Sequence, residues 1–106
     1  MDFAAITRRA LDVADRYESH ERRAHGRPWT LEERMLGLVG DVGDLAKLIQ
    51  AHEGVRIVED APAALEHELA DVLWSVIVIA DRCGIDLETA FVRTMDELGE
   101  RLGPPP

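Results

Sequence analysis

The sequence predicts an all-α protein, a four-helix bundle formed by a single domain over residues 1–106. Apolar residues recur three and four positions apart in four separate segments, which is the pattern of helices with one buried face. No segment alternates apolar and polar residues for long enough to predict a strand with confidence, and residues 55–58 are the one weak candidate. The proline-rich tail, residues 103–106, cannot extend a helix.

The first two helices are expected at about residues 2–24 and 31–51. The first carries an apolar stripe and ends before the turn sequence HGRPW. Thr30 and Glu33 have the spacing of a capping box, in which each side chain accepts a hydrogen bond from the backbone N–H of the other residue. The second helix therefore begins just after this threonine and ends before Gly54.

The last two helices are expected at about residues 60–82 and 87–102. Pro62 fits the first turn of the third helix, where a missing backbone N–H breaks no hydrogen bond, and Gly84 ends this helix. Asp86 can cap the fourth helix.

Charge and size narrow the classes of function. The net charge of −9 argues against binding to a nucleic-acid polymer or an anionic membrane, because both need a cationic surface. A single cysteine, Cys83, excludes an intramolecular disulfide, and the N-terminal residues lack the apolar core of a signal peptide, so a cytoplasmic protein is expected. A chain of 106 residues alone buries a smaller fraction of its surface than a larger protein does, which makes oligomerisation a reasonable expectation.

Two acidic pairs share one spacing. Asp41 and Asp44 lie three residues apart on the second helix, and Glu68 and Asp71 lie three apart on the third. Apolar neighbours on every side predict that Asp71 is buried, and a buried carboxylate must be protonated, paired with a cation or bound to a metal. Facing one another, the pairs would favour a divalent cation with oxygen ligands, above all Mg²⁺. For each pair alone, a solvated or salt-bridged acidic face is the alternative.

Three glycines, Gly37, Gly40 and Gly43, interrupt the second helix, and each costs roughly 1 kcal/mol relative to alanine. Either a neighbouring helix packs close there, or the missing side chains leave room for a ligand beside Asp41 and Asp44. The two interpretations are compatible.

The segments LVGDVGDLAKL and HELADVLWSVIVIADRCGIDLETA resemble the all-α nucleoside triphosphate pyrophosphatases, which include the MazG-like proteins and the dCTP pyrophosphatases. The signature of that family is E-x-x-E on one helix and E-x-x-D on the next, and the resemblance covers residues 29–102. It implies a helical bundle completed by oligomerisation, as a homodimer or a dimer of dimers. It also implies hydrolysis of a nucleoside triphosphate to a monophosphate and pyrophosphate with Mg²⁺ or Mn²⁺, in a role such as nucleotide-pool cleansing. The implied catalytic metal ligands are Asp41, Asp44, Glu68 and Asp71.

The resemblance also suggests substrate contacts and one departure. Trp29, in the loop before the second helix, is a candidate for stacking on a nucleobase, with a covering role over the core as the alternative. Family members usually carry a lysine and an asparagine on the last helix, where this chain has Thr94 and Leu98. Candidate replacements are Arg93, Arg101 or an arginine of a partner subunit, although a solvent-facing Arg93 is the alternative. The altered last helix keeps open a second function, that of a non-catalytic helical protein that binds nucleotides or partners.

Overall fold

Four helices make up the computed structural model, which describes residues 1–106. They are α1 (Phe3–His25), α2 (Leu31–His52), α3 (Ala61–Arg82) and α4 (Leu87–Leu102). No strand forms, and residues 55–58 lie in the loop between α2 and α3. The all-α class is therefore confirmed, with helix ends within one residue of those expected. None of the four helices combines the length and apolar character that a membrane span requires.

Local capping fixes the ends of the first two helices. The Asp2 carboxylate accepts a hydrogen bond from the backbone N–H of Ala5 at 2.8 Å, and Gly26 ends α1 in the left-handed conformation, with φ of 81°. The predicted capping box is present. Glu33 accepts from the backbone N–H of Thr30 at 2.9 Å, and the Thr30 hydroxyl accepts from the backbone N–H of Glu33 at 3.2 Å.

The starts of α3 and α4 differ from one another. Asp86 caps α4 by accepting from the backbone N–H of Thr89 at 3.1 Å. Asp60 precedes α3 but has a positive φ of 52°, and its side chain makes no capping hydrogen bond. A capping side chain needs an extended backbone at that position, so Pro62 in the first turn is the local signal that remains for α3.

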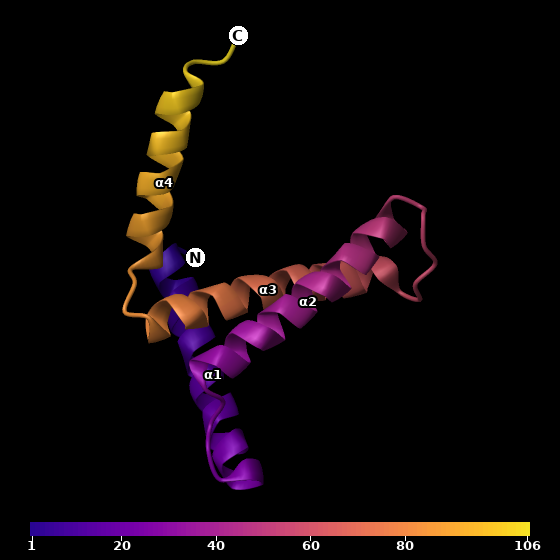
Figure 1. The fold of residues 1–106 in the computed structure, drawn as a ribbon, viewed down its shortest axis with the longest axis vertical. Helices are drawn as coiled ribbons and strands as arrows, with labels where there is room; N and C mark the ends of the chain where they lie inside the picture. The colour runs from indigo at the N-terminus through magenta and orange to yellow at the C-terminus, as the bar shows by residue number, and fades with distance from the viewer.

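The helices form an open arrangement around α3 (Figure 1). Helices α2 and α3 lie side by side as an antiparallel pair, α1 crosses α3, and α4 projects away from the pair. The indole Nε1 of Trp74 donates to the backbone carbonyl of Ala10 at 2.9 Å and so ties α3 to α1. The core is small, and its buried apolar residues are Ala10, Ala14, Leu48, Ile77, Val78 and Ala80.

The bundle expected from the sequence is not closed within one chain. The radius of gyration is 16.8 Å, where a compact domain of this length would have about 13 Å. No residue of α4 is buried, although the helix is amphipathic. Its exposed large apolar residues are Phe91, Val92, Met95, Leu98 and Leu102. A monomer leaves these side chains in water, because no other helix of the chain covers this face.

Candidate functional site

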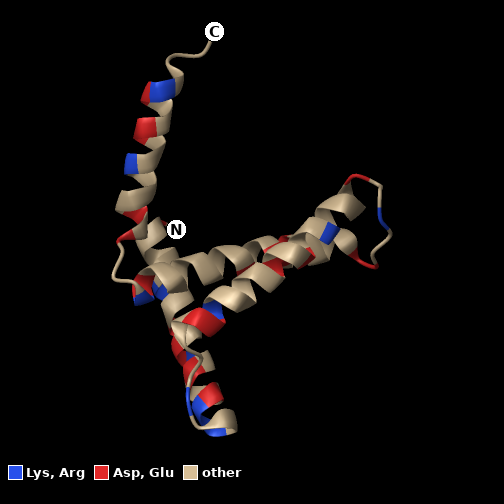
Figure 2. Ribbon diagram, viewed as in Figure 1, with Lys and Arg blue, Asp and Glu red and all other residues tan.

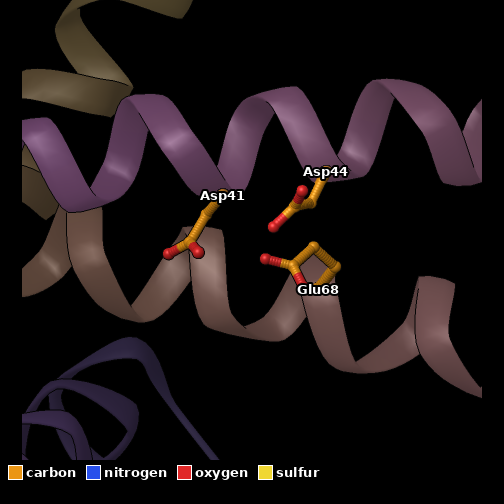
Figure 3. Close-up of side chains that lie close together, drawn as sticks. All are labelled: Asp41, Asp44 and Glu68. Carbon is orange, nitrogen blue, oxygen red and sulfur yellow. The ribbon is translucent and has the colours of Figure 1, made fainter.

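Three carboxylates meet between α2 and α3. Asp41 and Asp44 come from α2 and Glu68 from α3, and one oxygen of each lies within 4.8 Å of the others. Figure 3 shows the three side chains pointing toward one another across the space between the two helices. The antiparallel pairing of the helices brings the two acidic pairs opposite each other, as their spacing suggested. Figure 2 shows red, acidic segments of the ribbon midway along the α2–α3 pair.

No lysine, arginine or histidine forms an ion pair with this cluster, although the charge of His67 slightly opposes the effect of the other acids on Glu68. The chain forms six ion pairs, and none of them includes Asp41, Asp44 or Glu68. The Oε1 atom of Glu68 is buried and has no hydrogen-bond partner. Burial raises the pKa of Glu68 above its ordinary value, and the negative charges of the neighbouring aspartates raise it further. The cluster is therefore an acceptor site that lacks a positive charge.

The fourth acid, Asp71, lies beside Asp41. It is not one of the three residues whose carboxylate oxygens lie within 4.8 Å of one another. Desolvation raises the pKa of Asp71, and so do the charge of Asp41 and a hydrogen bond between the two side chains. The expectation that Asp71 is fully buried was wrong, since it is only half-buried. Two of its apolar neighbours, Leu69 and Leu73, are themselves 51% and 48% exposed, so an apolar setting in the sequence does not exclude water in a single chain.

A cavity of about 250 Å³ adjoins the acids, with Asp41 and Asp71 in its wall. Three aromatic side chains also line it, Tyr17, Trp29 and Trp74. The rings of Tyr17 and Trp74 pack with their centroids 5.5 Å apart, so one aromatic wall is fixed by packing. Trp29 is 47% exposed, which leaves its ring accessible to a ligand.

The three glycines of α2 differ in what lies next to them. A Cβ atom on Gly37 would lie 3.1 Å from the ring of Trp29, so this glycine allows the ring to approach the helix. Gly40 and Gly43 have open space where a side chain would be. The interpretation that a neighbouring helix packs against these glycines was wrong within this chain. The space beside Asp41 and Asp44 fits the second interpretation, room for a ligand.

The other predicted substrate residues lie apart from the cluster. Arg93 is exposed on α4, which projects away from the α2–α3 pair (Figure 1). The hydroxyl of Thr94 donates to the carbonyl of Ala90 at 2.8 Å, within its own helix. Leu98 belongs to the exposed apolar face of α4. Trp74, expected in the core, is only half-buried: its indole donates to the carbonyl of Ala10, and its side chain lines the cavity.

Sequence reasoning missed two charged residues of the cavity, Arg34 and Glu21. Arg34 is 9% exposed and is the one charged residue that the chain buries. A signal was present, because Arg34 lies seven residues before Asp41 and therefore on the same face of α2. For Glu21 the sequence holds no such signal, since its place depends on how α1 crosses the α2–α3 pair.

A family model and several known proteins are similar to this chain. The model of the MazG nucleotide pyrophosphohydrolase domain matches residues 29–102. Rat (Rattus norvegicus) dCTP pyrophosphatase 1 is 40% identical over 72 residues, which cover 63% of this chain and 42% of the relative. Human (Homo sapiens) dCTP pyrophosphatase 1 is 41% identical over 71 residues, covering 58% and 39%. Gene 37 protein of Mycobacterium phage L5 is 33% identical over 70 residues, covering 62% and 60%.

The matched part thus spans about two fifths of the length of the mammalian relatives. No solved structure matches the chain significantly. The family match includes all four acids and Trp29, and it extends over more than half of the sequence. The chain therefore belongs to the MazG nucleotide pyrophosphohydrolase domain family.

Proposed function

We propose that the protein is a Mg²⁺-dependent nucleoside triphosphate pyrophosphohydrolase, which converts a nucleoside triphosphate and water into a nucleoside monophosphate and pyrophosphate. The observation that carries the proposal is the uncompensated carboxylate cluster between α2 and α3, with its buried and unpartnered Glu68 oxygen. The family match and the two mammalian dCTP pyrophosphatases support this activity.

The acids of the cluster fit a divalent cation of the Mg²⁺ type. Such ions prefer oxygen ligands, and Asp41, Asp44 and Glu68 offer three carboxylates that no lysine or arginine pairs. These three residues would hold the ion, with Asp71 beside them. When bound, the ion neutralises phosphate charge and makes water more acidic. Mn²⁺ has the same ligand preference and is the expected substitute.

Residues of the chain supply the remaining steps. Asp71 borders the cluster and is half-buried, so we assign it the role of orienting the attacking water and accepting its proton. Cleavage breaks the anhydride bond between the α- and β-phosphates, the water oxygen adds to phosphorus, and pyrophosphate leaves. The half-buried setting limits competing water and strengthens these interactions.

The aromatic cavity is the proposed site of the base. Its volume of about 250 Å³ accommodates a nucleobase, and its wall includes both acids and aromatic rings. Trp29 is accessible and packs against Gly37, so its ring offers a stacking surface. These features support Trp29 as the proposed contact to the base.

We propose that the active form is a homodimer or a dimer of dimers. The chain exposes 8068 Å², whereas a folded monomer of 11.8 kDa would expose about 5,900 Å². The excess of about 2,200 Å² per chain is in the range that an obligate homodimer interface buries. The apolar face of α4 is the main candidate for that interface.

Association of two copies would also bring residues of α4 near the phosphates, which they do not approach in a single chain. The Thr94 hydroxyl donates a hydrogen bond within α4, and Arg93 lies on the same helix, which projects away from the α2–α3 pair. A second copy that docks on α4 would place such residues against another cluster. This makes Arg93 a proposed phosphate contact in trans.

Pyrophosphate release from a panel of canonical and modified nucleoside triphosphates, with Mg²⁺, Mn²⁺ or EDTA, tests the function. We expect release that depends on the metal and falls at least about a hundredfold in Asp71→Asn. Glu66→Gln, which changes an exposed acid of α3 without an ion pair, is the matched control and should retain full activity. Silence across the panel in a folded protein that binds metal would favour the second function, a non-catalytic protein that binds nucleotides or partners.

A further inference from the structure

We propose that Arg34 and Glu21 select the base of the nucleotide, so that the cavity favours a base with both a carbonyl and an exocyclic amino group, as in cytosine and guanine. Both residues line the cavity beside the acidic cluster. The inference rests on the proposed function, since it concerns the base end of the same site.

Arg34 has donors that the protein does not use. Its side chain is 8% exposed, and it donates one side-chain hydrogen bond, from Nη2 to Oε1 of Glu18 at 3.2 Å. Glu18 lies closer to Arg82, at 2.7 Å, so its charge is shared between two guanidinium groups. A guanidinium has five N–H donors, and none of the Arg34 nitrogens is both buried and without a partner, so water reaches the unused donors. Because Arg34 lines the cavity, a ligand carbonyl can replace that water as the acceptor.

The position of Arg34 favours the base over the phosphates. It lies seven residues before Asp41, which is about 10 Å along the axis of α2. The phosphates belong with the acids and their metal ion. Between them and Arg34, the cavity is lined by Gly37 and, from the antiparallel α3, by Trp74 and Val78, which offer the apolar surface that a base requires.

Glu21 favours a hydrogen-bond donor on the base, whereas Arg34 favours an acceptor. The Oε1 of Glu21 accepts a hydrogen bond from the backbone N–H of Trp29 at 2.9 Å, which fixes the carboxylate beside the cavity. The second oxygen can accept a hydrogen bond from a ligand, and an ionised carboxylate accepts hydrogen bonds but donates none. An exocyclic amino group is therefore attracted to Glu21, and a base carbonyl is repelled.

The two residues together define a substrate class. Cytosine and guanine each carry a carbonyl for Arg34 and an amino group for Glu21. Thymine and uracil have no amino group, and their ring N–H is flanked by carbonyls that the carboxylate repels. Adenine has an amino group for Glu21, but it offers Arg34 only ring nitrogens, which are weaker acceptors than a carbonyl oxygen. Thymine and uracil leave the carboxylate of Glu21 without a donor, and adenine gives Arg34 the weaker hydrogen bond, so both kinds of base lose binding free energy.

Tryptophan fluorescence tests this without turnover, because both tryptophans of the chain, Trp29 and Trp74, line the cavity. The full chain is titrated with dCMP, dGMP, dTMP and dAMP in the presence of Mg²⁺. We expect dCMP and dGMP to bind at least about tenfold more tightly than the other two. Arg34→Met should abolish discrimination against dAMP, and Glu21→Gln should abolish discrimination against dTMP.

Controls separate base selection from other effects. Arg9→Met and Glu32→Gln change exposed residues outside the cavity and should keep the wild-type profile. Glutamine at position 21 still accepts from the Trp29 N–H, so this variant decides the question even if Arg34→Met does not fold. Equal binding of the four monophosphates, no quenching by any of them, or unchanged selectivity in both variants would overturn the proposal.

A phosphate contact by Arg34 is a separate outcome. If Arg34→Met weakens binding of inorganic tripolyphosphate as much as binding of dCMP, the residue reads phosphate and the proposal fails. Because monophosphate binding needs no catalysis, a protein that binds selectively but releases no pyrophosphate would disprove the proposed activity and leave base selection intact.

Discussion

Replacing Glu68 with glutamine should have opposite effects on stability with and without a divalent cation. Glu68→Gln keeps the size of the side chain and removes one negative charge from the cluster. Two charges 4.8 Å apart, the limit that bounds these oxygens, repel by about 0.9 kcal/mol in water and about 3.5 kcal/mol at an effective dielectric constant of 20. Since the cluster is only partly buried, we take about 1 kcal/mol. The metal-free variant should therefore melt about 4 to 8 °C above wild type.

Added Mg²⁺ should reverse the order. At a Mg²⁺ concentration ten times its Kd, the wild-type protein gains about 1.4 kcal/mol. The variant, with one ligand changed from a carboxylate to an amide, should gain less than half of that. Thermal melts at pH 8, low ionic strength and fixed protein concentration, with EDTA or with Mg²⁺, measure both effects.

The control is Glu66→Gln, which changes an exposed acid on the same helix. It should shift the two melting temperatures equally and slightly. A Glu68→Gln variant that melts below wild type in EDTA would show that Glu68 is stabilised within the metal-free protein. That result would refute the account of an uncompensated cluster.

Three further expectations can be checked with single substitutions. Gly40→Ala, which meets open space, should raise the melting temperature through about 1 kcal/mol of helix propensity, whereas Gly37→Ala must displace the Trp29 ring and should change tryptophan fluorescence. Hydrogen bonds from the Arg27 side chain and the Thr30 backbone lower the pKa of Glu33 to about 2, so the stability they give is complete above pH 4.5 and is lost as the pH falls through about 2. Glu33→Gln should therefore lower the melting temperature at pH 7 and do so much less at pH 2. Phe91→Asp should shift the sedimentation coefficient to that of a monomer, and an unchanged assembly would exclude α4 from the interface.

The sequence predicts the helices well because their ends depend on local chemistry. Thr30 and Glu33 form the capping box that their spacing indicated, and Gly26 ends α1 in the left-handed conformation. Asp60 shows the limit of such signals, since residue type alone does not specify that its backbone adopts a positive φ and leaves the cap unused.

The site is predictable only in part, for a different reason. The spacing of the acids places them on helix faces, and the antiparallel α2–α3 pair then brings Asp41, Asp44 and Glu68 together. The half-exposed state of Asp71 and the cavity position of Glu21 depend on how whole helices cross and on which faces stay uncovered. Those are properties of tertiary packing, and periodicity in one segment does not determine them.

The antiparallel pairing of α2 and α3 has a consequence for how this site tolerates change in length. All four acids belong to one helical hairpin, and residues 53–60 between its helices hold none of them. The entropic cost of a longer connection grows slowly, by about 0.6 kcal/mol for each doubling of the loop. Insertions in this segment can therefore lengthen the gap between the two acidic pairs along the sequence while the carboxylates keep their places in space. A search for distant relatives should accordingly fix the spacing within each acidic pair and leave the distance between the pairs free.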